Sequence, residues 1–193
     1  MHFTNGIKRN FGMNNLKSLF SIGVCISNIK NINNNELIEL CHAKCKNIEN
    51  GKYDFSNEKE IDVIKSMFLK EGYNYLKQVL GTNKFINLTI DKIWGNVNVD
   101  RAIGNPHNHR SSLLSLVYYL TKGTIVFQNP YLPSLSQIHQ KDIDTYNQYN
   151  CDVWELNMIP GDLVVFNSQL LHYAIQTSND DRISIACDMS MKR

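Results

Sequence analysis

The sequence has no marked excess of either charge and no long apolar run. Its 20 lysine and arginine residues stand against 18 aspartates and glutamates, which gives a net charge of +2 at pH 7. This balance gives no electrostatic reason to expect a nucleic-acid partner. The most apolar stretch, residues 113–120, is far shorter than the roughly 20 residues that a helix needs to cross a bilayer. We therefore expect neither nucleic acid nor a membrane among the partners.

The number of cysteines is odd. The five cysteines cannot all pair with one another, and a chain of 193 residues can form a core without disulfides. Free thiols are typical of a reducing compartment. No small-residue cleavage site follows the weak apolar stretch 19–26, so we predict no secretory signal. The expected location is the cytoplasm, and a homodimer is among the assemblies that the composition allows.

One cysteine pair resembles half of a metal site. Cys41 and Cys45 are one helical turn apart, but a zinc site needs about four ligands and no second pair follows. We therefore expect both thiols to pack inward.

The length and the 42% apolar content fit one domain over residues 1–193. Residues 1–84 are predicted to hold a strand at about 16–26 and two supporting helices. The apolar spacing places the helices at about 36–47 and 57–80, the second ending at Gly81.

Residues 85–193 have a different pattern, in which apolar and polar residues alternate with a period of two. After the alternation that begins at residue 86, further strands are predicted at 113–120, 124–127, 162–166 and 183–188. Helices followed by short antiparallel strands favour a mainly β, α+β fold. Its core would be a jelly roll, that is, a cupin-like double-stranded β-helix with the N-terminal helices packed outside. The long polar loop 129–151 is the expected mobile rim of its mouth.

Three histidines are the candidate metal ligands. His107 and His109 form an H-x-H pair, and residues two apart on an extended segment point the same way. His172 is expected on, or just beyond, the strand that ends at Phe166, where strands meet at the mouth of a closed barrel. Imidazole suits iron, zinc, copper or nickel, so the spacing alone does not select the metal.

A candidate anion site follows ten residues after the third histidine. Arg182 and Ser184 lie on one face of a predicted strand. A guanidinium group can hold a carboxylate through two parallel hydrogen bonds, and a nearby hydroxyl adds a third.

Three stretches carry a resemblance to a known family: NPHNHRSSLLSLVYYL (105–120), PGDLVVFNSQLLH (160–172) and DRISIA (181–186). They resemble the 2-oxoglutarate/Fe(II) oxygenase superfamily, in particular the subgroup of 2OG-Fe(II) oxygenases common in marine bacteria and their phages. The resemblance covers most of the chain, and its specific motifs lie within residues 94–188.

The resemblance implies a role for each motif residue. His107, His109 and His172 match the iron ligands. Arg182 matches the residue that binds the distal carboxylate of 2-oxoglutarate, with Ser184 as its companion.

Two further residues are implied to line the co-substrate pocket. Tyr119 matches a tyrosine that touches the co-substrate in prolyl hydroxylases, and Asn98 is a weaker candidate. The superfamily's usual ligand set is H-x-D/E…H, so His109 stands where a carboxylate is usual. This departure leaves open whether His109, a water molecule or an acid such as Asp100 completes the set.

The implied activity is oxidation of a substrate coupled to decarboxylation of 2-oxoglutarate, with Fe(II) as the metal and O2 as the oxidant. Such an enzyme would be a dioxygenase, most simply a hydroxylase, acting on a small molecule or a protein side chain. Two alternatives remain open. One is a cupin-like three-histidine metalloprotein, such as a 2-oxoglutarate-independent dioxygenase or an isomerase, and the other is a non-catalytic binding barrel.

Overall fold

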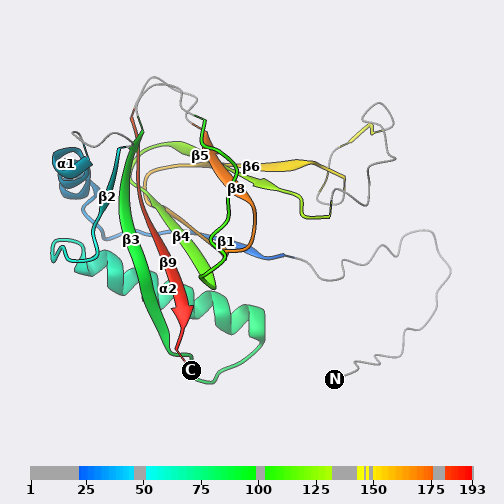
Figure 1. Ribbon diagram of the computed structural model, residues 1–193, viewed down its shortest axis with the longest axis horizontal. Coiled ribbons are helices and arrows are strands. Elements are labelled where there is room, and N and C mark those ends of the chain that lie inside the picture. Colours follow the sequence, from blue (N-terminus) through cyan, green and yellow to red (C-terminus); the bar gives the residue numbers. More distant parts are fainter. Residues whose placement is uncertain are drawn as a thin grey trace.

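The nine strands and two helices of the computed structural model are shown in Figure 1, and residues 22–45, 51–98, 103–131, 143–145, 147, 150–175 and 181–192 are described. The helices are α1 (Asn34–Cys45) and α2 (Asp62–Leu80). The strands are β1 (Val24–Asn28), β2 (Lys52–Asp54), β3 (Leu88–Asn98), β4 (Leu114–Tyr119), β5 (Gly123–Gln128), β6 (Val153–Met158), β7 (Asp162–Asn167), β8 (His172–Ile175) and β9 (Arg182–Met191).

The strands form two antiparallel sheets. The larger sheet has the order β1-β7-β4-β9-β3-β2, and the smaller one has the order β6-β5-β8. Isolated bridges between Ile103 and Ile175 and between His107 and His172 extend the smaller sheet beyond β8. The predicted mainly β fold with a double-stranded β-helix core is confirmed.

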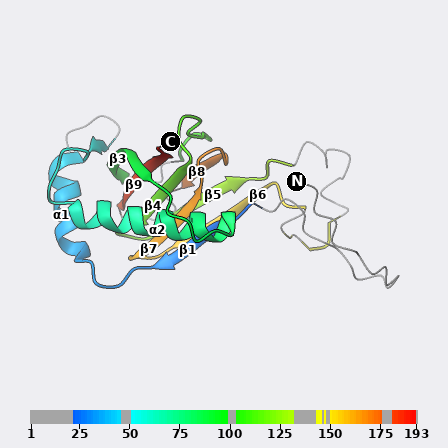
Figure 2. The ribbon, with the colours of Figure 1, turned by 90° about the horizontal axis from the view of Figure 1, so that it is seen from below.

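Successive side chains of the central strands point to opposite faces of the larger sheet, and each face packs into its own hydrophobic core. Apolar residues on one face of the larger sheet pack with α1 and α2, and Leu116 of β4 and Ile185 of β9 are two of them. On the opposite face Val117 and Ala186 pack with residues of the smaller sheet. The larger sheet is therefore the middle layer, with helices on one side and the smaller sheet on the other (Figures 1 and 2). This explains why β4 is buried along its whole length.

The second helix begins later than the sequence pattern predicts. Residues 57–61 form turns, in which Glu58 N–H bonds Phe55 O and Asp62 N–H bonds Lys59 O. Phe55 and Ile61 are both fully buried, and these two anchors hold the segment between them in turns. The predicted end is confirmed: Gly81 has φ +59, a left-handed conformation that glycine adopts without strain.

The N-terminal part supplies strands as well as helices. β1 pairs with β7, and β2 pairs with β3, so the larger sheet needs both. The first predicted strand, at 16–26, is displaced toward the C-terminus, since β1 ends at Asn28 and residues 1–21 lie outside the described ranges. Cys41 and Cys45 are buried, as predicted. Within the described residues, no helix is long and apolar enough to span a membrane.

Candidate metal centre

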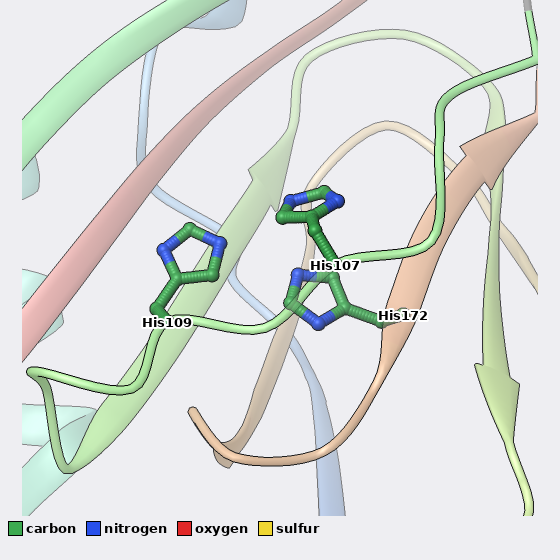
Figure 3. A group of neighbouring side chains, drawn as sticks. All are labelled: His107, His109 and His172. Carbon is green, nitrogen blue, oxygen red and sulfur yellow. The ribbon is translucent and has the colours of Figure 1, made fainter.

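Three histidines converge between the two sheets. His107 lies in the bridge beside β8, His109 two residues further on, and His172 opens β8. Backbone hydrogen bonds fix this arrangement, because His107 and His172 exchange both N–H···O bonds, at 3.0 and 2.9 Å. Figure 3 shows the three rings turned toward one another. One ring nitrogen from each lies within 4.8 Å of the other two, so the group could hold a metal ion.

Each imidazole has an acceptor on its Nδ1 side. His107 Nδ1 bonds Asn105 O and His172 Nδ1 bonds Leu170 O, both at 2.8 Å. His109 Nδ1 bonds a carboxylate oxygen of Asp188. A ring that donates from Nδ1 keeps the lone pair of Nε2 for a metal. His109 Nε2 is buried and has no hydrogen-bond partner among the described residues, which fits a metal ligand.

The walls of the site are aromatic and apolar. Trp94 of β3 stacks on the His109 ring with centroids 5.8 Å apart. Phe166 packs edge-on against His172. His172 is only 6% exposed, and its burial lowers its pKa to about 4. The imidazole is therefore neutral near pH 7 and can act as a ligand.

Asp188 is a buried acid on the inner face of β9. Besides His109, it accepts a hydrogen bond from Ser115 Oγ at 2.7 Å. Ser115 Oγ in turn lies 3.0 Å from Ser168 Oγ. The cross-strand pairing of Asp188 with Ser115 places both side chains on the cavity side of the larger sheet.

Arg182 lies at the other end of the same face of β9. It is 6% exposed, and its guanidinium donates to Asn98 Oδ1 at 3.2 Å and to Tyr119 Oη at 3.5 Å. Its Nε is buried and has no partner among the described residues. Gly123 leaves room for it, because a Cβ there would lie 3.0 Å from Arg182 Cδ and Nε. A buried cation with a free donor fits a carboxylate ligand.

One cavity of about 140 Å³ extends from the three histidines to Arg182. The three histidines, Arg182 and Asn98 all line it. Ser184 and Ala186 lie between Arg182 and Asp188 on this face of β9, and the residues that alternate with them face the helices. A small dicarboxylic acid entering this cavity meets a possible metal site and a guanidinium.

Of the seven residues named from the sequence, five line the cavity: His107, His109, His172, Arg182 and Asn98. Tyr119 contacts the Arg182 guanidinium. His172 begins a separate strand of the smaller sheet and does not continue the strand ending at Phe166. Ser184 is fully buried, is not among the residues that line the cavity, and accepts a hydrogen bond from Asn96 Nδ2 at 3.5 Å. Asp100 and most of the predicted rim, 132–142, 146 and 148–149, lie outside the described residues.

Sequence reasoning missed four polar residues of the site: Asp188, Ser115, Ser168 and Asn96. Each is buried. The alternation that placed Arg182 and Ser184 on one face also places Asp188 there, so the pattern offered a usable indication for that residue.

Taken together, the double-stranded β-helix, the three converging imidazoles and the buried arginine define a metalloprotein of the oxygenase type. The chain belongs to the family described as "Putative 2OG-Fe(II) oxygenase", which it matches over residues 92–188, half of its length. It is thus an enzyme of the 2-oxoglutarate- and iron-dependent oxygenase class.

Solved structures share the fold at low sequence identity. HygX from Streptomyces hygroscopicus, with nickel and 2-oxoglutarate bound, superposes with a TM-score of 0.57 at 10% identity, covering 88% of this chain and 82% of its own. The carbocyclase SnoK from nogalamycin biosynthesis has a TM-score of 0.56 at 13% identity, covering 89% and 80%. The epimerase SnoN, in complex with Fe3+, alpha ketoglutarate and nogalamycin RO, has a TM-score of 0.57 at 11% identity, covering 88% and 79%. No curated protein sequence matches the chain.

Proposed function

We propose that this enzyme is a 2-oxoglutarate-dependent dioxygenase that hydroxylates its substrate. In this reaction 2-oxoglutarate, O2 and a C–H bond of the substrate give succinate, CO2 and an alcohol. One oxygen atom of O2 enters succinate and the other enters the new hydroxyl group. The observation that carries the proposal is the presence of three inward-facing imidazoles and a buried arginine in one cavity.

His107, His109 and His172 are the proposed Fe(II) ligands. Imidazole nitrogen is a suitable donor for Fe(II), and a three-point set leaves further coordination positions for the keto acid and for O2. Iron supplies the redox chemistry when it is bound, while the protein orients the reactants and excludes side reactions. The neutral state of His172 and the acceptors on all three Nδ1 atoms keep the ligands ready for the metal.

Arg182 is the proposed anchor of the distal carboxylate of 2-oxoglutarate. Asn98 and Tyr119 hold the guanidinium from two neighbouring strands, and the Tyr119 ring lies beneath it with its centroid 5.3 Å from Cζ. Ser184 lies on the same face of β9, where its buried hydroxyl accepts a hydrogen bond from Asn96. The Trp94 indole and the apolar side chains opposite narrow the cavity between Arg182 and the histidines.

The first test is turnover without a primary substrate. Such enzymes often decarboxylate the keto acid slowly even when no substrate is oxidised. Purified protein with Fe(II), O2 and 2-oxoglutarate labelled at its C1 carboxyl carbon should therefore release labelled CO2 and form succinate. His172→Ala should abolish this release. His42→Ala is the matched control, because His42 lies on α1 and does not line the cavity.

A protein that binds iron but never forms succinate, with or without candidate substrates, would contradict the dioxygenase assignment. That result would favour a 2-oxoglutarate-independent three-histidine enzyme. Succinate formation that survives His172→Ala unchanged would move the metal site elsewhere.

A further inference from the structure

Asp188 has the surroundings of a functional carboxylate rather than of a surface acid. It is 7% exposed, and no lysine or arginine of the described chain lies within 4 Å of its carboxylate. Its hydrogen-bond partners there are the His109 imidazole on one oxygen and the Ser115 hydroxyl on the other. Burying a charge is costly unless it is paired. Among the described residues, His109, together with whatever it binds, is the group that can offset the charge of Asp188.

The three histidines differ in what holds their Nδ1 atoms. Neutral backbone carbonyls hold His107 and His172, whereas a carboxylate holds His109. A carboxylate on Nδ1 fixes the ring orientation and the tautomer, and it makes Nε2 a stronger donor to a metal. His109 is also the ligand that stands where the superfamily's usual triad has its carboxylate.

We propose that Asp188 is the positioning residue of the metal centre and supplies, one imidazole ring away from the metal, the negative charge that a three-histidine ligand set lacks. Ser115 donates to the Asp188 carboxylate behind His109, and Ser168 in turn hydrogen-bonds Ser115. This inference rests on the proposed function, because it takes His109 to be a metal ligand.

The shape of the site supports this division of roles. Trp94 stacks on one face of the His109 ring while Asp188 holds its edge, so the ring has little freedom to turn. The remaining nitrogen, Nε2, is the one that the described chain leaves without a partner. Removing the charge of Asp188 should therefore weaken metal binding without changing which nitrogen faces the metal.

The test compares two aspartates that both accept serine hydrogen bonds, Asp188 buried beside His109 and Asp91 exposed. Asp188→Asn keeps the size of the side chain and removes its charge. The matched control is Asp91→Asn, since Asp91 likewise accepts serine hydrogen bonds, from Ser112 at 3.0 Å and from Ser190 at 2.5 Å, while none of its hydrogen bonds to described residues involves a histidine. Binding of Co(II) and of anaerobic Fe(II) is measured by competition with a coloured chelator, and folding is checked by thermal melting of the metal-free proteins.

We expect the metal dissociation constant to rise about 10- to 100-fold in Asp188→Asn and to stay within twofold of wild type in Asp91→Asn. Nitrogen-15 NMR of the Zn(II)-loaded proteins should show that the His109 Nδ1–H signal alone shifts in Asp188→Asn. If Asp188→Asn binds metal as wild type does, or both variants weaken equally, the proposal is overturned. If wild type binds no metal at the histidines, the proposed function fails and this inference fails with it.

If Asp188→Asn folds poorly, a second pair of variants tests the same role by moving the carboxylate from position 188 to position 109. His109→Asp places a carboxylate in the ligand set, where it would meet the charge of Asp188. The double variant His109→Asp/Asp188→Asn removes that repulsion and should bind Co(II) more tightly than His109→Asp alone, a non-additive result. Tighter binding by the single variant would refute the role of Asp188 as the source of charge.

Discussion

Replacing Arg182 by alanine should separate co-substrate binding from metal binding. Arg182 is 6% exposed, and the described polar partners of its guanidinium are Asn98 and Tyr119, neither of which is charged. Its removal therefore breaks no ion pair of the described chain. None of the three histidines is touched by it, so the affinity for Fe(II) should stay within about twofold of wild type.

Arg182→Ala should lose much of its affinity for 2-oxoglutarate. Removing one partner of a buried, hydrogen-bonded charge pair costs about 2–5 kcal/mol. At about 1.4 kcal/mol per tenfold, the lower figure already corresponds to a dissociation constant raised about 30-fold. Arg182→Lys should recover only part of this, because an ammonium group cannot form the two parallel hydrogen bonds of a guanidinium.

The assay is an anaerobic titration of the Fe(II) protein with 2-oxoglutarate, followed by the absorption band of the metal-bound keto acid. Lys122→Ala is the control: it removes the same charge from an exposed residue next to Gly123. Equal 2-oxoglutarate affinity in wild type and Arg182→Ala would show that another group anchors the distal carboxylate. Loss of Fe(II) as well would show that the arginine supports the fold rather than the co-substrate.

Three further changes have outcomes that follow from local geometry. Gly123→Ala should raise the dissociation constant for 2-oxoglutarate severalfold in the same titration, because its Cβ would press on Arg182 and Tyr119 at 3.0 Å; unchanged affinity would mean that the guanidinium can move freely. Cys41 should react with iodoacetamide at pH 8 far more slowly than Cys25, since burial raises the pKa of Cys41 to about 12, and equal labelling rates by mass spectrometry would contradict its burial. Phe55→Ala should lower the free energy of unfolding by about 3–5 kcal/mol in urea, and a loss below 1 kcal/mol would contradict its packing.

The elements that were predicted from the sequence are those whose pattern of apolar and polar residues is complete within a few positions of the chain. β4, β7 and β9 lie in the middle layer, so their alternating or continuous apolar residues are visible within six or so positions. The same alternation placed Arg182 and Ser184 on one face, and it is the cavity face. The H-x-H pair is also local, and two residues of separation were enough to predict convergence.

The parts that were missed depend on contacts between distant segments or on exposure. β6 is an edge strand with mostly exposed residues, and its Trp154 is 48% exposed. β2 has three residues and β8 has four, so these strands are too short to show the period-two alternation by which strands are predicted. Asp188 resembles the polar end of a strand, and only the pairing of β9 with β4 and the return of the His109 loop show what it contacts.

The most direct test is a crystal structure of the protein grown anaerobically with Mn(II), a redox-inactive stand-in for Fe(II), and 2-oxoglutarate. We predict one anomalous peak bonded to Nε2 of His107, His109 and His172. The keto acid should chelate this metal through its C1 and C2 oxygens, with its distal carboxylate on Arg182. A metal held by only two of these histidines, or a keto acid whose distal carboxylate lies away from Arg182, would contradict the proposed centre.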